Sequence, residues 1–338
     1  MNKIAVVIMN LGGPDSMDAI EPFLRNLFSD PDIFNLPFGQ KLFAKIISKR
    51  RAPKVAEEYE LIGGKSPINE WTELQRSMLE TRLREIFSSA SSTDSKADLL
   101  SIDVFTAMRY WNPLTAEIAE KVAAGNYDKV ILLPLYPHYS ITTTGSSFNE
   151  WKRVYKGDMS KVAYIRNYYN QPLYIKAINE RIDECLLRFP EERRNIVNIL
   201  FSAHGTPVSL VKKGDPYSGE IRNTMETVMK LRSYSHMYHL SFQSKVGPVK
   251  WLEPATDDKL MELGSKGVKD VLVVPVSFVS DHVETSFELD IEYRHNAEEA
   301  KIENYIVMTG LNGSSTFVEG LAELVSSEIT GKKEILNP

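Results

Sequence analysis

Five acidic residues and a histidine follow directly after one apolar run of the sequence. Val273, Val274 and Val276 predict a buried strand. The polar residues that come next are Asp281, His282, Glu284, Glu288, Asp290 and Glu292. Imidazole together with carboxylate suits Fe(II) or Zn(II) that is weakly held with open coordination positions. The segment therefore predicts a transient metal site at the end of a strand.

Three of these carboxylates, Glu284, Glu288 and Glu292, recur every four residues. On a helix this spacing places them on one face, where they form either a solvated surface or a stripe that passes a divalent cation inward. His282 and Glu284 lie only two residues apart, and such residues do not share a face of a regular helix. If they act together, the first turn of the helix must be bulged, a distortion that recurs at functional sites.

His204 ends another apolar run, "NILFSA", and precedes Gly205. A single histidine is more often structural. At the carboxyl end of a strand, however, an imidazole can bind a metal or accept a proton near neutral pH. His138, in "PLYPHY", has a comparable position.

The segment 32–54 mixes apolar side chains with lysine and arginine. It predicts either an amphipathic core helix or a basic, apolar lip that receives a hydrophobic anion or touches a membrane surface. Arg109 adds a cation suited to carboxylates. Aromatic walls are expected from Tyr59, Tyr110, Trp111, Tyr136, Tyr139, Trp251 and Phe278. The ligand this describes is large, flat, apolar and negatively charged at its rim.

Short β-branched runs alternate with helical patterns along the chain, which predicts parallel sheets covered on both faces. The expected strands are 4–9, 101–107, 130–135, 162–166, 197–202, 238–242 and 271–276. Helices are expected at 69–87, 114–124, 173–188, 220–231 and 257–263.

The two halves of the chain also resemble each other. "NLGGP" (10–14) corresponds to "AHGTP" (203–207), and "MRYWNP" (108–113) to "QSKVGP" (243–248). We expect two similar α/β units with the ligand in a cleft at the carboxyl ends of their strands. The first is residues 1–165, completed by a C-terminal helix at 305–338. The second is residues 166–304 and carries the metal site.

Composition narrows the class of function. Hydrophobic residues make up 43% of the 338 and charged residues 25%, as in a soluble globular protein, and the net charge of −5 disfavours a nucleic-acid partner. "NLGGP" lacks the dinucleotide-binding fingerprint. The single cysteine, Cys185, cannot form an internal disulfide or hold an iron–sulfur cluster. The N-terminal apolar run is too short for a signal segment, so a cytoplasmic protein is expected.

The sequence resembles the ferrochelatase family over nearly its whole length. The resemblance rests on "NLGGPDS", "RRAPKVAEEYELIGGKSPI", "MRYWNPLT", "PLYPHYSITTTGSS", "LFSAHGTP", "KGDPY", "QSKVGPVKWLEP" and "SDHVETSFELDIEY". It implies two Rossmann-like, chelatase-type units and a lyase that inserts ferrous iron into protoporphyrin IX to form protohaem, the last step of haem biosynthesis. "QSKVGPVKWL" is similar to members that use protoporphyrin rather than coproporphyrin. Two departures are "SAHGTP", where many members have Ser-Leu-Pro after the histidine, and Phe242, where some carry tryptophan.

The resemblance also implies roles for particular residues. His204 and Glu284 are the metal-coordinating pair and the core of catalysis, with His282 as a supporting catalytic residue. Glu288 and Glu292 form the metal route. The porphyrin site is lined by Arg51, Tyr59, Ser66 and Arg109 and flanked by Trp251 and Phe278.

The expected partners are protoporphyrin IX and ferrous iron as substrates, with no nucleic acid and with peripheral membrane contact through residues 34–51. No tightly bound cofactor is expected. An iron–sulfur cluster is not expected either, since the cysteine-rich extension of animal members is not seen. Two alternatives stay open: a chelatase for coproporphyrin or cobalt, and a non-catalytic metal- or haem-binding protein with the same two-lobed fold.

Overall fold

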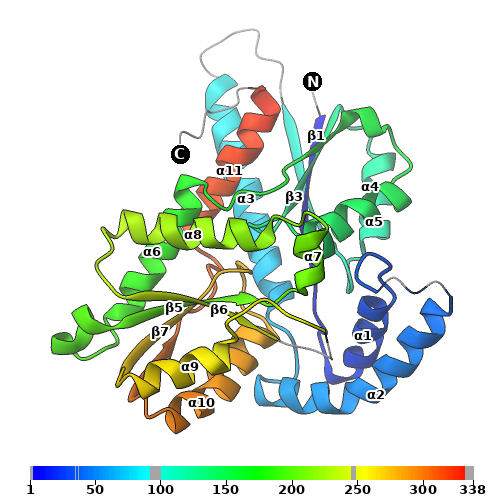
Figure 1. Cartoon of the computed structure of the whole chain (residues 1–338). Helices are drawn as coiled ribbons and strands as arrows, with labels where there is room; N and C mark the ends of the chain where they lie inside the picture. The colour runs from blue at the N-terminus through cyan, green and yellow to red at the C-terminus, as the bar shows by residue number, and fades with distance from the viewer. Residues whose placement is uncertain (1–2, 35, 37, 92–99, 245–248, 332–338) are drawn as a thin grey trace.

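Two four-stranded parallel sheets form the frame of the molecule (Figure 1). The computed structural model describes residues 3–34, 36, 38–91, 100–244 and 249–331. The first sheet has the order β2-β1-β3-β4 and the second the order β6-β5-β7-β8. The strands are β1 (Lys3–Asn10), β2 (Ser101–Met108), β3 (Lys129–Pro134), β4 (Val162–Tyr164), β5 (Asn198–His204), β6 (Tyr238–Gln243), β7 (Asp270–Pro275) and β8 (Asn304–Val307). The shared order confirms the expectation of two similar α/β units.

Helices cover both faces of each sheet. They are α1 (Ile20–Phe28), α2 (Gln40–Leu61), α3 (Ile68–Ser91), α4 (Thr115–Ala124), α5 (Ser146–Val154), α6 (Pro172–Leu186), α7 (Val208–Lys212), α8 (Tyr217–Leu231), α9 (Thr256–Ser265), α10 (Tyr293–Glu299) and α11 (Ser315–Thr330). Two π-helices, η2 (Ile141–Gly145) and η5 (Glu284–Glu292), follow the third strand of each sheet. The short 3₁₀ segments are η1 (Met17–Ala19), η3 (Met159–Lys161) and η4 (Glu191–Ile196).

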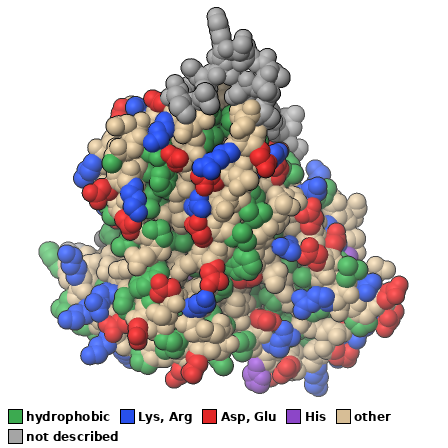
Figure 2. Space-filling model, turned by 180° about the vertical axis from the view of Figure 1, so that it is seen from behind, with side chains coloured by type: hydrophobic (Ala, Val, Ile, Leu, Met, Phe, Trp, Pro, Cys, Tyr) green, Lys and Arg blue, Asp and Glu red, His purple; other side chains and the backbone are tan. Residues whose placement is uncertain are grey.

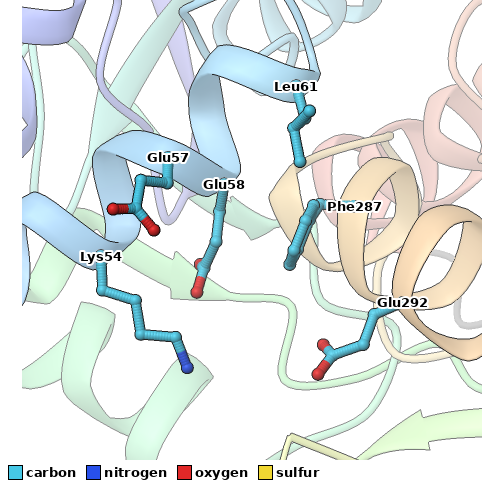
Figure 3. A pocket seen from close by; sticks show the side chains of 6 residues that line it. All are labelled: Lys54, Glu57, Glu58, Leu61, Phe287 and Glu292. Carbon is cyan, nitrogen blue, oxygen red and sulfur yellow. The ribbon is translucent and has the colours of Figure 1, made fainter.

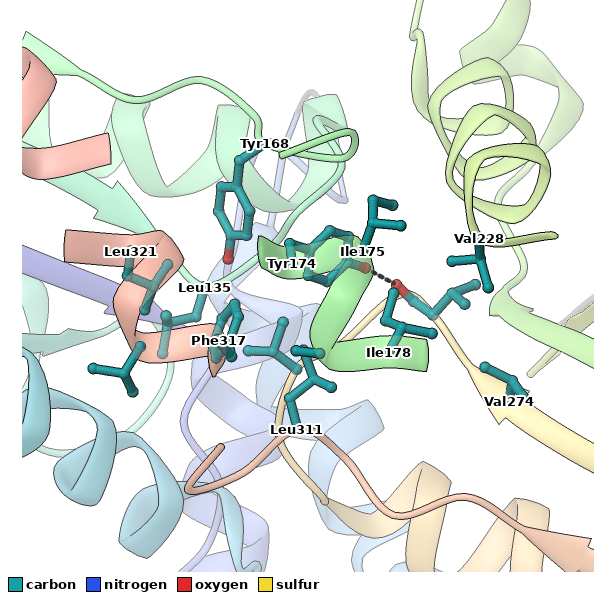
Figure 4. Close-up of a cluster of buried hydrophobic side chains, with 14 of the residues drawn as sticks. Leu135, Tyr168, Tyr174, Ile175, Ile178, Val228, Val274, Leu311, Phe317 and Leu321 are labelled. Atoms are coloured by element: carbon teal, nitrogen blue, oxygen red, sulfur yellow. Dashed lines mark hydrogen bonds between the residues drawn. The ribbon is translucent and has the colours of Figure 1, made fainter. Parts of the chain in front are cut away.

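The inner faces of the two sheets share one hydrophobic core. Alternate residues of a strand point to opposite faces, so Ile8 of β1 lies in this core while Val7 packs under the helices of the outer face. Phe201 of β5 and Val274 of β7 enter the same core from the second sheet. Figure 4 shows side chains of α6 and α11 packed together in it. This continuous packing fixes the carboxyl ends of both sheets relative to each other.

One sequence correspondence between the halves was wrong. The amide of Met108 donates to the carbonyl of Pro113 at 2.8 Å, and the amide of Phe242 donates to that of Pro254 at 2.9 Å. Pro254 is therefore the counterpart of Pro113, because the loop after β6 is longer than the loop after β2. Pro248, the expected counterpart, lies outside the described residues.

The segment expected as a helix from residue 305 begins as a strand. β8 pairs in parallel with β7, with Tyr305 opposite Val271. The helix α11 begins only at Ser315, where the Ser314 hydroxyl accepts a hydrogen bond from the amide of Phe317. Helix α11 then packs against α3, α6 and β3.

Candidate active site

The carboxyl ends of β5 and β6 and the segment after β7 bring three polar side chains together. His204 is the last residue of β5 and lies opposite Gln243, the last residue of β6. The imidazole Nδ1 of His204 lies 2.9 Å from Oε2 of Glu284. The side-chain amide of Gln243 donates to the same oxygen at 3.4 Å. The pairing of His204 with Glu284 is a geometry the sequence alone did not show.

His282 joins this group from the non-helical residues just before the π-helix that carries Glu284. Its Nε2 lies 3.5 Å from Oε2 of Glu284, and its ring is buried. A regular α-helix would turn these two residues, two apart, to different faces. The sequence required a distorted first turn if they were to act together, and the π-helix η5 begins at Glu284. Glu284 Oε2 is thus faced by three nitrogen atoms from three different elements.

The charges of the pair stabilise each other. Burial disfavours the imidazolium of His204, but the charge and hydrogen bond of Glu284, with Glu288 behind it, raise the pKa of His204 above its ordinary value. Burial likewise disfavours the carboxylate of Glu284, yet the charges and hydrogen bonds of His204 and His282 hold its pKa well below its usual range. These opposite pKa shifts favour an imidazolium at His204 facing a carboxylate at Glu284.

The carboxylate stripe runs from a buried to an exposed position. Glu288 accepts hydrogen bonds from the amide of Ser244 at 2.8 Å and the hydroxyl of Tyr293 at 3.0 Å. Burial and the nearby charge of Glu284 raise the pKa of Glu288. Glu292, at the end of η5, is exposed. The three carboxylates therefore range from a buried to an exposed position, and their role as a metal route stays a prediction.

Glu292 lies at a pocket between α2 and η5 (Figure 3). The pocket has a volume of about 170 Å³ and is lined by Lys54, Glu57, Glu58, Leu61, Phe287 and Glu292. Burial, opposed by the charge of Lys54, raises the pKa of Glu58, and the charge of Glu292 adds to that rise.

Within the described ranges, no group of three or more histidine, cysteine or acidic side chains forms a closed metal site.

Aromatic side chains surround the pair. The ring of Phe278 lies 4.2 Å from the ring of His282 and 6.3 Å from that of His204, centroid to centroid. Trp251 forms a strand bridge with Pro207, just after His204. Gly205 allows this approach, because a Cβ atom there would lie 2.6 Å from the carbonyl oxygen of Gln243. Phe278 thus lies beside His204 and His282, and Trp251 lies beside the segment that follows His204; that they flank a porphyrin stays a prediction.

Three other expected porphyrin contacts, Tyr59, Ser66 and Arg51, lie in or next to helix α2. Tyr59 and Ser66 are buried. Burial raises the pKa of Tyr59, opposed by a hydrogen bond from Ser66, and the charge of Glu284 adds to the rise, so this tyrosine of α2 lies within electrostatic range of Glu284. The guanidinium carbon of Arg51 lies 5.8 Å from the ring of Phe28.

Arg109 is bound within the protein. One guanidinium nitrogen, Nη2, lies 3.0 Å from the fully buried carboxylate of Asp30. Its Nε donates to the hydroxyl of Ser146 at 2.9 Å. The structure therefore gives Arg109 a structural partner, and its contact with a ligand stays a prediction.

His138 lies apart from the pair. It is buried, and its Nε2 is 2.8 Å from the hydroxyl of Thr224. Burial lowers the pKa of His138 to about 3, so the ring is neutral. His204 and His138 have similar positions at strand ends in the sequence, but only His204 lies in the candidate site, and His138 lies in the core.

Sequence reasoning missed Gln243, Tyr217 and Ser277, which all contact the pair. The quoted segment "QSKVGP" contained Gln243, and the rule that parallel strands end at one edge could have placed it beside His204. Tyr217 and Ser277 bind the backbone of His204 through side-chain hydroxyls. No spacing signal in the sequence marks them.

The fold is that of tetrapyrrole chelatases. CbiX, described as the terminal enzyme for biosynthesis of sirohaem in denitrifying bacteria, superposes with a TM-score of 0.51 at 11% identity, covering 97% of this chain and 99% of that one. SirB from Bacillus subtilis, solved with Fe³⁺, superposes with a TM-score of 0.50 at 11% identity, covering 98% of each chain. At this identity the likeness establishes the two-unit architecture only.

Sequence comparison identifies the family. The ferrochelatase family model matches residues 3–329. Proteins named ferrochelatase from Geotalea daltonii and Aquifex aeolicus are 46% and 45% identical to this chain. They cover 96% and 97% of it, and the matches span 98% and 100% of the relatives themselves. The chain belongs to the ferrochelatase family, lyases of haem biosynthesis that insert Fe²⁺ into protoporphyrin IX.

Proposed function

We propose that this chain inserts ferrous iron into protoporphyrin IX with His204 and Glu284 as the reacting pair. The observation that carries the proposal is the 2.9 Å contact between His204 Nδ1 and Glu284 Oε2. In the described part of the chain, the other ring nitrogen of His204, Nε2, has no protein partner, and about a third of its side chain is exposed. This nitrogen is available to a substrate.

The charge state of the pair suits an exchange of protons for metal. Insertion removes two protons from the pyrrole nitrogens and binds one Fe²⁺, so the site must accept protons and supply a cation. Fe²⁺ arriving at the Glu284 carboxylate weakens its attraction for the imidazolium and favours release of the His204 proton. The neutral imidazole then accepts the two pyrrole protons in turn and passes the first to solvent before it takes the second. Glu284 remains as the anionic contact for iron.

The direct test is an anaerobic absorbance assay with Fe(II) and protoporphyrin IX. His204→Ala should lose at least nine tenths of the turnover and keep the wild-type circular dichroism, which shows that the fold is intact. His295→Ala is the matched control, since His295 is an exposed histidine on α10, and it should retain full activity. Retained turnover above about a tenth in His204→Ala would contradict the assignment.

We further propose that helix α2 contacts an anionic membrane surface. Phe38, just before α2, and Leu42 and Ile46 on α2 are 92%, 62% and 60% exposed and recur every four residues. Lys41, Lys45, Lys49 and Arg50 on the same helix are also exposed. In Figure 2, blue and green side chains alternate on the lower-left flank, the side where α2 lies when Figure 1 is turned. Among the described helices, none is long and apolar enough to cross a bilayer.

An exposed apolar row flanked by cations is typical of a helix that lies in a lipid interface. Cosedimentation with vesicles of phosphatidylglycerol and phosphatidylcholine should show binding that decreases with salt. Leu42→Ser with Ile46→Ser should reduce binding about tenfold and leave turnover with detergent-solubilised porphyrin unchanged. The exposed apolar residues Leu187 and Leu231, far from α2 in sequence, supply the control pair. Equal binding by both double variants would contradict the proposal.

A further inference from the structure

Three hydrogen bonds form a closed ring on the backbone of His204. Its amide donates to the hydroxyl of Ser277 at 2.6 Å. The hydroxyls of Ser277 and Tyr217 lie 2.7 Å apart. Tyr217 donates its proton to the carbonyl oxygen of His204 at 2.9 Å. With Ser277 donating to Tyr217, each hydroxyl gives one hydrogen bond and accepts one, so the ring is complete.

The ring replaces strand pairing that ends just before His204. On the side of β7, the ladder of β5 stops where Ser202 lies opposite Pro275. A buried backbone amide and carbonyl beyond that point need other partners, since an unpaired group costs about 1–3 kcal/mol. Ser277 follows β7 and Tyr217 begins α8, and both are buried. They supply these partners from two separate elements.

The position of Tyr217 is itself fixed. Its backbone amide donates a hydrogen bond to the carboxylate of Asp215 at 3.0 Å, which holds the start of α8 in place. A second carboxylate oxygen of Asp215 accepts hydrogen bonds from Ser140 and Ile141, at the start of η2 in the first unit. The ring therefore ties the backbone of His204 to both units of the fold.

We propose that Tyr217 and Ser277 are positioning residues that fix the backbone of His204 so that its Nδ1 faces Glu284 and its Nε2 faces the substrate. The inference rests on the proposed function of His204. Neither hydroxyl touches the imidazole or the carboxylate in the structure. Their effect is on orientation, and it should appear in kcat rather than in the affinity for porphyrin.

The test compares hydroxyl removal with hydroxyl retention. Tyr217→Phe and Ser277→Ala should each lower kcat about tenfold and leave the KM for protoporphyrin within about twofold of wild type. Because the ring acts as one unit, the double variant should be no slower than the slower single variant. Ser277→Thr keeps the hydroxyl and should restore kcat to within about threefold of wild type.

Tyr174→Phe is the matched control. Its hydroxyl also donates to a buried backbone carbonyl, that of Val276 at 3.3 Å (Figure 4), but it does not reach His204. Its ring packs against His138, as the ring of Tyr217 does. Tyr174→Phe should lose stability and keep kcat.

Two results would overturn the inference: full kcat in Ser277→Ala, or an equal loss of kcat in Tyr174→Phe. If Tyr217→Phe does not fold, the comparison of Ser277→Ala with Ser277→Thr still decides. Failure of the proposed function is a separate result, because it requires that His204→Ala itself remain active.

Discussion

Replacing Glu284 by glutamine removes one charge from the centre of the site and keeps the shape of the side chain. Unit charges about 4 Å apart attract by about 4 kcal/mol at an effective dielectric constant of ~20. The His204 side chain is 34% exposed, so solvent screening reduces this attraction, and we expect about 1–2 kcal/mol. Because the charge of Glu284 and its hydrogen bond raise the pKa of His204, that pKa should fall toward its ordinary value in this variant.

The direction of the pH effect follows from the raised pKa of folded His204. A raised pKa means that the imidazolium stabilises the folded state below the unfolded pKa of about 6.5. This contribution is lost as pH rises through the higher folded value. In Glu284→Gln the stabilising contribution of the His204 imidazolium should be largely absent. The difference in the free energy of unfolding that His204 makes between wild type and variant should therefore disappear at alkaline pH.

Titration of the histidine ring resonances by NMR measures the shift, with the His204 signal assigned by its absence in His204→Ala. The kcat of Glu284→Gln should be at least about 100-fold lower, or about 2.7 kcal/mol, because iron loses its anionic contact. Asp290→Asn is the control. It also removes a carboxylate from the π-helix, but the Asp290 carboxylate pairs with Arg294 and not with His204. An unchanged pKa of His204 together with kcat within threefold of wild type would refute the coupling of the pair.

Three further predictions concern the surroundings of the pair. Glu288→Gln and, more weakly, Glu292→Gln should raise the KM for Fe(II) and leave the KM for porphyrin unchanged; equal losses of kcat with unchanged iron dependence would mean that the stripe is structural. Arg109→Leu should lower the free energy of unfolding by about 3–5 kcal/mol in denaturant titrations, because the buried Asp30 loses its partner; full stability with a raised porphyrin KM would instead place Arg109 at the ligand. Burial lowers the pKa of His138 to about 3, so the wild type should lose up to about 1.4 kcal/mol of stability per pH unit as pH falls below about 6.5. His138→Gln should flatten this dependence of stability on pH between pH 7 and 5.5. Identical slopes in the two proteins would contradict a buried neutral ring.

The sequence predicted the frame because local patterns determine it. Strand β7 is apolar at every position between Asp270 and Pro275, and such runs are typical of strands buried on both faces. β8 was missed because its four residues are too short to show a clear strand pattern. His204 was predicted correctly at the end of a strand, since position at the end of a parallel strand can be inferred without side-chain geometry.

The partners of His204 could not be predicted in the same way. Ser277 and Tyr217 lie 73 and 13 residues away in sequence, and what joins them is the register at which β5 and β7 end. The π-helix had a weak signal, because a functional role for both His282 and Glu284 required a distorted turn. Its extent over nine residues depends on packing against other elements.

The opposite pKa directions of Glu284 and Glu288 show why the three-dimensional arrangement matters for function. The two carboxylates lie on the same π-helix, four residues apart, and burial raises the pKa of both. For Glu284 two histidines more than reverse this effect, so its charge is retained and can contact iron. For Glu288 the charge of Glu284 adds to it, and the hydrogen bonds from Ser244 and Tyr293 offset it only in part. Glu288 therefore gains a proton more readily than Glu284. Neighbouring carboxylates of one π-helix thus differ in proton affinity because of their partners, and passage of iron along them stays a prediction that the KM for Fe(II) of the Glu288 and Glu292 variants tests.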